Sequence, residues 1–133
     1  MTTGLDTFDD FSWANLLAGR DVLVLDPDAA RGLRTANALD AAGARASRVA
    51  SVEAARDRML RRAFVLAVVA LPGEASIDEA LHAQFAAAGL HLMLLAEPAR
   101  HAALRARHPG ARVAGLDLGE RQFVMLLTGT ADE

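Results

Sequence analysis

The residues best suited to chemistry form a basic group between positions 100 and 112. The group consists of Arg100, His101, Arg105, Arg107, His108 and Arg112. His101 and Arg105 are four residues apart, so they share one face of a helix, and His108 continues that face one turn further on. Guanidinium groups bind phosphates bidentately and stack on bases, which suits an anion or cyclic-dinucleotide pocket. A protein docking surface and a solvated helix face are the other two interpretations.

The sequence lacks the residues that most catalytic mechanisms need. The sequence contains no Cys and no Lys, so all 14 of its Lys plus Arg residues are Arg. This composition excludes disulfides, thiolate chemistry and any mechanism that needs a side-chain ammonium. The motifs G-x-G-x-x-G, G-x-x-x-x-G-K, G-x-S-x-G and H-E-x-x-H are absent, and no His has a catalytic partner at a typical spacing. The sequence therefore predicts a protein that is not an enzyme and that has no metal or cofactor.

Charge and hydropathy restrict the partners of the chain. The net charge is -3, which provides no basic field for direct binding of nucleic acid. No apolar run approaches the roughly 18 residues that span a bilayer. The first eleven residues, MTTGLDTFDDF, are acidic and lack the basic-then-apolar order of a signal peptide. We expect a soluble, cytoplasmic protein without membrane contact.

The elements that must position any site are organised around residues 63–73, AFVLAVVALPG. The run from Phe64 to Leu71 has no charged or hydrogen-bonding side chain and stops at Pro72 and Gly73. A strand that is apolar on both faces must be covered on both sides, as in the centre of a parallel sheet between helices.

Strands and helices are expected to alternate about five times along the rest of the chain. The expected strands are residues 21–25, 44–50, 64–71, 90–96 and 111–116, and the expected helices are 29–42, 52–62, 77–88, 99–107 and about 119–128. Such alternation favours right-handed crossovers and a parallel sheet with helices on both faces. Functional groups are then expected at the carboxyl ends of the strands.

Helical spacing assigns a buried face to each of these helices. In the first helix Ala30 and Leu33 belong to the buried stripe, and Arg31 and Arg34 lie on the wetter face. In the second helix Ser51 is the N-cap, while Val52, Ala55, Met59 and Leu60 are buried and the four arginines are solvated. Ser76 and Glu79 have the spacing of a capping box for the third helix, and Gly89 ends it.

The ends of the chain lie outside this alternating pattern. We expect residues 1–19 to be an N-terminal extension with a short helix at 7–18, residues 20–128 to be one domain, and residues 129–133 to be a frayed tail. Trp13, the only Trp, either caps the core or anchors a partner or a second copy. The last helix, which contains Phe123, is the other candidate interface.

The pattern of VLVLDPD at 22–28, VEAARDRML at 52–60 and VVALPG at 68–73 resembles the receiver domain of bacterial response regulators. The resemblance extends from residue 21 to about 127 and implies a flavodoxin-like fold, a five-stranded parallel sheet with strand order 2-1-3-4-5. It also implies that the fourth helix, the fifth strand and the fifth helix form the face for dimers and partners.

The resemblance further implies where the phosphorylation machinery of a receiver would lie. The acidic pocket that holds Mg²⁺ falls on Asp26 and Asp28, with Pro27 at the position of the second adjacent acid. The phosphoacceptor Asp falls on Val68, and the two switch positions fall on Leu95 (or Ala96) and Leu116. The Lys of the family has no counterpart, since the chain has no Lys. The chain is therefore expected to be a degenerate receiver that takes no phosphoryl group.

Two functions remain open at this point. The first is a stand-alone pseudoreceiver, an adaptor or regulator in bacterial signal transduction or transcription control that acts by protein contacts and possible homodimerisation. The second is a sensor that binds a phosphorylated small molecule or cyclic dinucleotide through the arginine group. The candidate partner or ligand surface consists of Trp13, Arg100, His101, Arg105, Arg107 and Phe123. The sequence does not name the partner, the pathway or the oligomeric state.

Overall fold

The computed structural model describes residues 17–119 and 121–123, so most of the predicted N-terminal helix at 7–18, most of the predicted last helix and the frayed tail lie outside these residues. The described chain contains a five-stranded, fully parallel sheet with strand order β2-β1-β3-β4-β5. The strands are β1 (Asp21–Leu25), β2 (Arg45–Val49), β3 (Leu66–Ala70), β4 (His91–Ala96) and β5 (Arg112–Gly115). The predicted fold class and strand order are confirmed.

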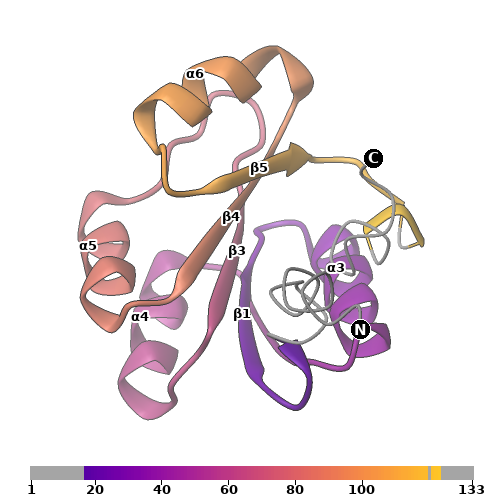
Figure 1. Cartoon of the computed structure of the whole chain (residues 1–133), viewed down its shortest axis with the longest axis vertical. Coiled ribbons are helices and arrows are strands. Elements are labelled where there is room, and N and C mark those ends of the chain that lie inside the picture. Colours follow the sequence, from indigo (N-terminus) through magenta and orange to yellow (C-terminus); the bar gives the residue numbers. More distant parts are fainter. Residues whose placement is uncertain (1–16, 120, 124–133) are drawn as a thin grey trace, which may run out of the picture.

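Helices cover both faces of this sheet (Figure 1). They are α3 (Ala29–Ala41), α4 (Val52–Arg61), α5 (Glu79–Ala88) and α6 (His101–Arg107), and a short 3-10 turn, η1 (Pro98–Arg100), precedes α6. Helices α4, α5 and α6 contribute to the hydrophobic cluster on one face, and α3 contributes to the cluster on the other. Within the described residues no helix is long and apolar enough to cross a bilayer.

Strand β3 lies in the centre of the sheet, paired with β1 on one side and β4 on the other. All five of its residues are buried, and they alternate between the two clusters. Ala67 and Val69 face the side of α4 and α5, whereas Leu66, Val68 and Ala70 face the side of α3. The apolar run identified in the sequence is thus a strand buried on both faces, as predicted.

The buried stripes of two helices differ from the prediction. In α3 the buried residues are Gly32, Thr35, Ala36, Ala38 and Leu39. The predicted stripe was wrong at its start, since Ala30 is exposed and Leu33 is 47% exposed. In α4 only Ala55 is fully buried, and Leu60 is 81% exposed. Helical spacing fixes which residues share a face, but the helix's rotation about its axis against the sheet decides which of those faces is covered.

Side chains at the helix ends explain where the helices begin. Ser51 caps α4 as predicted, because its Oγ accepts a hydrogen bond from the N–H of Ala54 at 3.2 Å. The N-cap of α5 is Asp78 and not Ser76, since Asp78 Oδ2 accepts from the N–H of Leu81 at 2.9 Å. Gly89 ends α5 with a φ of 72°, a left-handed conformation that glycine adopts without strain.

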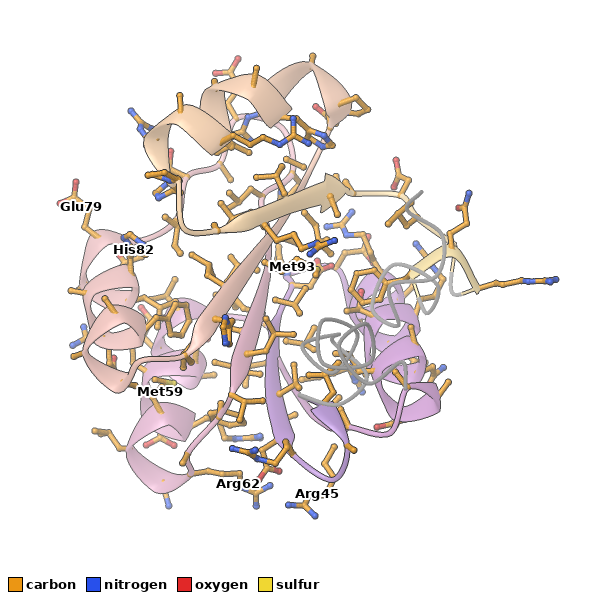
Figure 2. The ribbon with its side chains drawn as sticks, viewed as in Figure 1. Arg45, Met59, Arg62, Glu79, His82 and Met93 are labelled. Carbon is orange, nitrogen blue, oxygen red and sulfur yellow. The ribbon has the colours of Figure 1, made fainter. Side chains whose placement is uncertain are left out.

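Arginines form ion pairs at the amino ends of the strands, opposite the expected functional edge. Arg45 and Arg62, which Figure 2 labels, both pair with Asp21, at 3.3 and 3.4 Å. The hydrogen bond from Arg45 lowers the pKa of the Asp21 carboxyl, and the charges of both arginines act in the same direction. Both arginines remain more than half exposed, so these pairs are weak contributors to stability.

The position of the α5 cap can be tested by comparing two substitutions. Asp78→Ala removes the acceptor of the Leu81 N–H and is expected to lower the free energy of unfolding by about 1 kcal/mol. Ser76→Ala, at the position that the sequence favoured, is expected to change it by less than about 0.5 kcal/mol. Urea denaturation followed by circular dichroism measures both, and a larger loss for Ser76→Ala would refute the assignment.

Candidate functional site at the carboxyl ends of the strands

Asp26 follows β1 directly and is only 4% exposed. Its carboxylate accepts three hydrogen bonds. The backbone N–H of Asp28 donates to Oδ1 at 2.8 Å, and Arg31 donates from Nε to Oδ2 at 2.7 Å and from Nη2 to Oδ1 at 2.8 Å. Two nitrogens of the guanidinium therefore donate to the two carboxylate oxygens, and this bidentate arrangement is the strongest geometry for such a pair.

Arg31 reaches Asp26 because it lies in the first turn of α3, five residues further along the chain. Its side chain is 14% exposed and that of Asp26 is 2% exposed, so the pair is largely shielded from water. The hydrogen bonds to Asp26 raise the pKa of the Arg31 guanidinium above its ordinary value. The prediction that Arg31 lies on the wetter face of its helix was wrong, whereas Arg34 is exposed as expected.

The second predicted acid of the pocket has a different environment. Asp28 is exposed and caps α3, and its Oδ1 accepts from the N–H of Arg31 at 2.9 Å. This backbone hydrogen bond lowers the pKa of the Asp28 carboxyl, and the positive charge of Arg31 acts in the same direction. Among the described residues no group of three or more His, Asp or Glu side chains could hold a metal ion.

An apolar layer lies beneath the ion pair on the same face of the sheet. Val68 is 1% exposed and pairs in register with Val24 of β1 and Met93 of β4, whose position Figure 2 labels. Val68 is the middle residue of β3, whereas the last residue of the strand on the same face is Ala70. The position that the resemblance assigns to the phosphoacceptor therefore lies inside the sheet, and the end of the strand on this face carries an alanine.

The two predicted switch positions lie in the same apolar layer. Leu95 is 3% exposed and Leu116 is 7% exposed, and both belong to the cluster that contains Val68. With Arg31, Thr35 and Phe123 they line a cavity of about 10 Å³, which is about the space that one water molecule needs. The structure thus brings the predicted positions together around a space that is too small for a ligand.

Phe123 was predicted to belong to a partner or ligand surface, and this prediction was wrong. Its side chain is 3% exposed and packs in the cluster on the α3 side of the sheet. The local turn explains this position: the N–H of Phe123 donates to the carbonyl of Gly119 at 2.9 Å, and Gln122 Oε1 accepts from the N–H of Gly119 at 3.0 Å. These bonds start a helical turn that aims Phe123 at the sheet.

Arg100 connects the start of α6 to the loop after β3. Its Nη1 donates to the carbonyls of Leu71 and Gly73 at 2.9 and 2.8 Å, and its Nη2 donates to the carbonyl of Ala75 at 2.7 Å. Both terminal nitrogens of the guanidinium are therefore hydrogen-bonded to main-chain oxygens. Arg100 orders the β3–α5 loop, and its fork is not available to a phosphate in this arrangement.

Most remaining members of the basic group lie on α6 and just after it, and Arg112 is the first residue of β5. Arg105 and Arg107 are exposed, while His101 is half-buried and its Nε2 lies 2.8 Å from the carbonyl oxygen of Ala96. His108 packs edge-on against His82 of α5, with ring centroids 5.0 Å apart. Burial lowers the pKa of His108, and the nearby His82 and Arg107 act in the same direction. Trp13, the other candidate surface residue, lies outside the described residues.

The contacts of Arg31 and Arg100 were not predicted from sequence alone. For Arg31 a signal existed, since an arginine in the first turn after Asp26, Pro27 and Asp28 can fold back onto the first carboxylate. For Arg100 no local signal existed, because its three acceptors lie 25 to 29 residues earlier in the chain.

Comparison with known proteins identifies the fold. No protein-family model and no curated protein matches the chain. The chemotaxis response regulator CheY4 of Vibrio cholerae has a TM-score of 0.66 at 12% identity, covering 85% of this chain and 99% of that one. HP1043, an orphan response regulator of H. pylori, has a TM-score of 0.62 at 17% identity, covering 85% and 94%.

A third similar structure has a different description. It is described as a pilus assembly protein, CpaE, from Burkholderia thailandensis, and has a TM-score of 0.55 at 24% identity, covering 86% of this chain and 99% of that one. At these identities the likeness concerns the fold. The chain has the flavodoxin-like fold of response regulator receiver domains, as the sequence resemblance implied.

The Asp26–Arg31 pair can be tested by removing one or both charges. Arg31→Met leaves a buried carboxylate without its partner and is expected to lower the free energy of unfolding by about 3 to 5 kcal/mol. The double variant Asp26→Asn with Arg31→Met is expected to lose less than the sum of the two single variants, because the amide still accepts from the Asp28 N–H without a buried charge.

Urea denaturation of all three variants measures these differences. Arg34→Met is the matched control, since Arg34 is an exposed arginine of the same helix, and it is expected to change stability by less than about 0.5 kcal/mol. If Arg31→Met unfolded at the same urea concentration as the wild type, the buried pair would not contribute as described.

The role of Arg100 can be tested through the mobility of the β3–α5 loop. Arg100→Ala removes three charge-assisted hydrogen bonds and is expected to cost about 1 to 3 kcal/mol of stability. Amide hydrogen exchange should become faster in residues 71–76 and remain unchanged in β1. Arg105→Ala, on the exposed side of α6, is the control, and equal exchange in the two variants would contradict the role assigned to Arg100.

Proposed function

We propose that the protein is a non-phosphorylatable pseudoreceiver, a regulator or adaptor that acts through protein contacts and not through phosphoryl transfer. The observation that carries this proposal is the bidentate ion pair between Asp26 and Arg31. A receiver needs its acidic pocket to hold Mg²⁺ beside a phosphoacceptor carboxylate. Here a guanidinium of the same chain already neutralises the buried carboxylate, and β3 ends in Val68, Val69 and Ala70.

The other positions of the machinery support the same proposal. Phosphorylation acts by adding about -1.5 to -2 charge units, which nearby donors then capture. Leu95 and Leu116 have no polar side-chain atom to follow a phosphoryl group, and both are buried. A chain that neither accepts the charge nor responds to it is regulated by its amount, its partner or a ligand, and it needs no catalytic residue.

The surface of α6 is the proposed docking site for a protein partner. In receiver domains the face built from the corresponding helix and the fifth strand forms dimers and binds partners. Arg105 and Arg107 are exposed on α6, and α6 packs beside the edge strand β5. This charge favours an acidic partner surface, including a second copy of this chain, whose net charge is -3.

A sensor for phosphorylated ligands is the second candidate function, and the structure of the arginine group weakens it. Arg100 donates to three main-chain carbonyls, so only Arg105 and Arg107 of the three proposed arginines remain available. Arg107 borders a broad cleft of about 510 Å³ that Glu79 also lines, and the carboxylate of Glu79 opposes a phosphate there. Two exposed arginines in this setting would give weak, salt-sensitive binding of phosphates.

The proposal can be tested first by attempted phosphorylation. Incubation with acetyl phosphate and Mg²⁺ is expected to leave the intact mass unchanged, while a competent receiver domain in a parallel reaction gains one phosphoryl group. A mass increase of one phosphoryl group at an acidic residue of this chain would overturn the proposal.

Affinity purification from the native host with three bait proteins tests the docking surface. Pilus assembly and response regulator components are the first partners to examine. The wild type and the Arg58→Ala variant, which changes an exposed residue of α4, are expected to retain the same partner. The double variant Arg105→Ala with Arg107→Ala is expected to recover at least about tenfold less of this partner. Equal recovery by all three baits would move the interface away from α6.

A further inference from the structure

A second cavity opens at the carboxyl ends of β1 and β3, on the face of the sheet that α4 and α5 cover. Its volume is about 250 Å³. Its floor is formed by Leu25, Val69 and Leu71, which are 7%, 2% and 2% exposed. Pro27, Pro72 and Ile77 contribute to its sides. The cavity therefore presents a mainly apolar interior to the solvent at its mouth, and we call it the switch-point cleft.

The position of the cleft is the one at which open parallel sheets bind ligands. The chain leaves β1 to form β2 on one side and then crosses to form β3 on the other, so the strand order reverses between β1 and β3. At such a point the connections from neighbouring strands diverge to opposite faces and leave a crevice outside the carboxyl ends. Here the crevice lies on the α4 and α5 side, and the Asp26–Arg31 pair lies beside the opposite cluster.

Hydrogen bonds hold the walls of the cleft in place without a ligand. The N–H of Leu71 donates to the carbonyl of Leu95 at 2.8 Å, which fixes the strand end. Beyond it, Arg100 donates to the carbonyls of Leu71, Gly73 and Ala75, and Leu71 and Ala75 both line the cleft. A preformed cleft costs little ordering entropy when it is filled, which favours binding.

The charges around the cleft select the kind of molecule that fits it. Among the described residues that line it, Asp78 is the only ionisable one, and none of them is Arg or His. The helix ends that face it are already capped, by Ser51 Oγ on the N–H of Ala54 and by Asp78 on the N–H of Leu81. An anion would therefore meet a carboxylate and no free cationic partner, whereas a neutral or cationic molecule would meet no such penalty.

The volume sets the size of that molecule. An apolar cavity of about 150 Å³ is sufficient for benzene, and pockets for drug-sized ligands start near about 300 Å³. We propose that the switch-point cleft binds a small, predominantly apolar organic molecule without negative charge, of about the size of one bicyclic ring. This site is additional to the docking surface on α6 and opposite in charge preference to a phosphate sensor.

Three indoles that differ mainly in charge test the proposal: neutral indole, cationic tryptamine and anionic indole-3-acetate. Each is titrated into the full-length ¹⁵N-labelled protein, and amide chemical shifts are followed. Indole and tryptamine are expected to cause saturable shifts that centre on Ser51, Val69 and Ile77, with indole-3-acetate binding at least about tenfold more weakly. Absence of saturable shifts, shifts centred elsewhere, or equally tight binding of the anion would each overturn the proposal.

Filling the cleft provides an independent test of the location. Ala75→Leu places a larger side chain at a lining position that is exposed at the mouth, and it is expected to weaken indole binding at least about tenfold. Ala103→Leu makes the same change on the exposed side of α6 and is expected to leave the affinity unchanged. Equal affinities in these two variants would refute the site.

Stability must be unchanged for this comparison to hold, so urea denaturation accompanies each titration. If Ala75→Leu failed to fold, Ala50→Leu would make the same test from the β2–α4 side of the cleft. Neither position lies on α6, so failure of the indole experiment leaves the partner experiment unaffected, and the two proposals can fail separately.

Discussion

The burial of both faces of β3 is the constraint on which the rest of the structure depends. Its five residues are covered on one side by α4 and α5 and on the other by the cluster that contains α3. Parallel strands need long crossovers, and the helices in those crossovers supply this cover. Because all five strands run in one direction, their carboxyl ends meet at one edge. The candidate positions Asp26, Leu95 and Leu116 all lie at that edge for this reason.

At that edge a buried negative charge is compensated by other groups of the same chain. Asp26 is shielded from water, and an isolated carboxylate there would be costly, so the guanidinium of Arg31 and the N–H of Asp28 compensate it. The same bonds occupy the carboxylate that a cation would need. The edge thus keeps the shape of the receiver fold while the carboxylate of Asp26 is bonded to groups of the same chain.

Much of the fold was predictable because apolar patterning and helix boundaries are local properties. The apolar runs of β1, β3 and β4 and the glycine after α5 were recognisable in the sequence, and the strand order followed from the family resemblance. The exposure of Leu33 was not predictable, because the alanine-rich helix α3 has more than one face that is apolar enough to be buried. The exposure of Leu60 depends on how the last turn of α4 lies against the sheet. The cap at Asp78 was missed because Ser76 offers the same kind of acceptor two residues earlier.

The sequence by itself determined that the chain has no Lys, no Cys and no carboxylate within the central strand, and these absences exclude whole classes of mechanism in any fold. It also determined the alternating elements that make a parallel sheet the favoured solution. Only the tertiary structure decided that Arg31 turns inward, that Phe123 is buried and that Arg100 binds a loop some 25 residues away in sequence. The physical reason is that these outcomes depend on which acceptors and which apolar surface the packed sheet brings within reach of each side chain. Spacing along the chain does not contain that information.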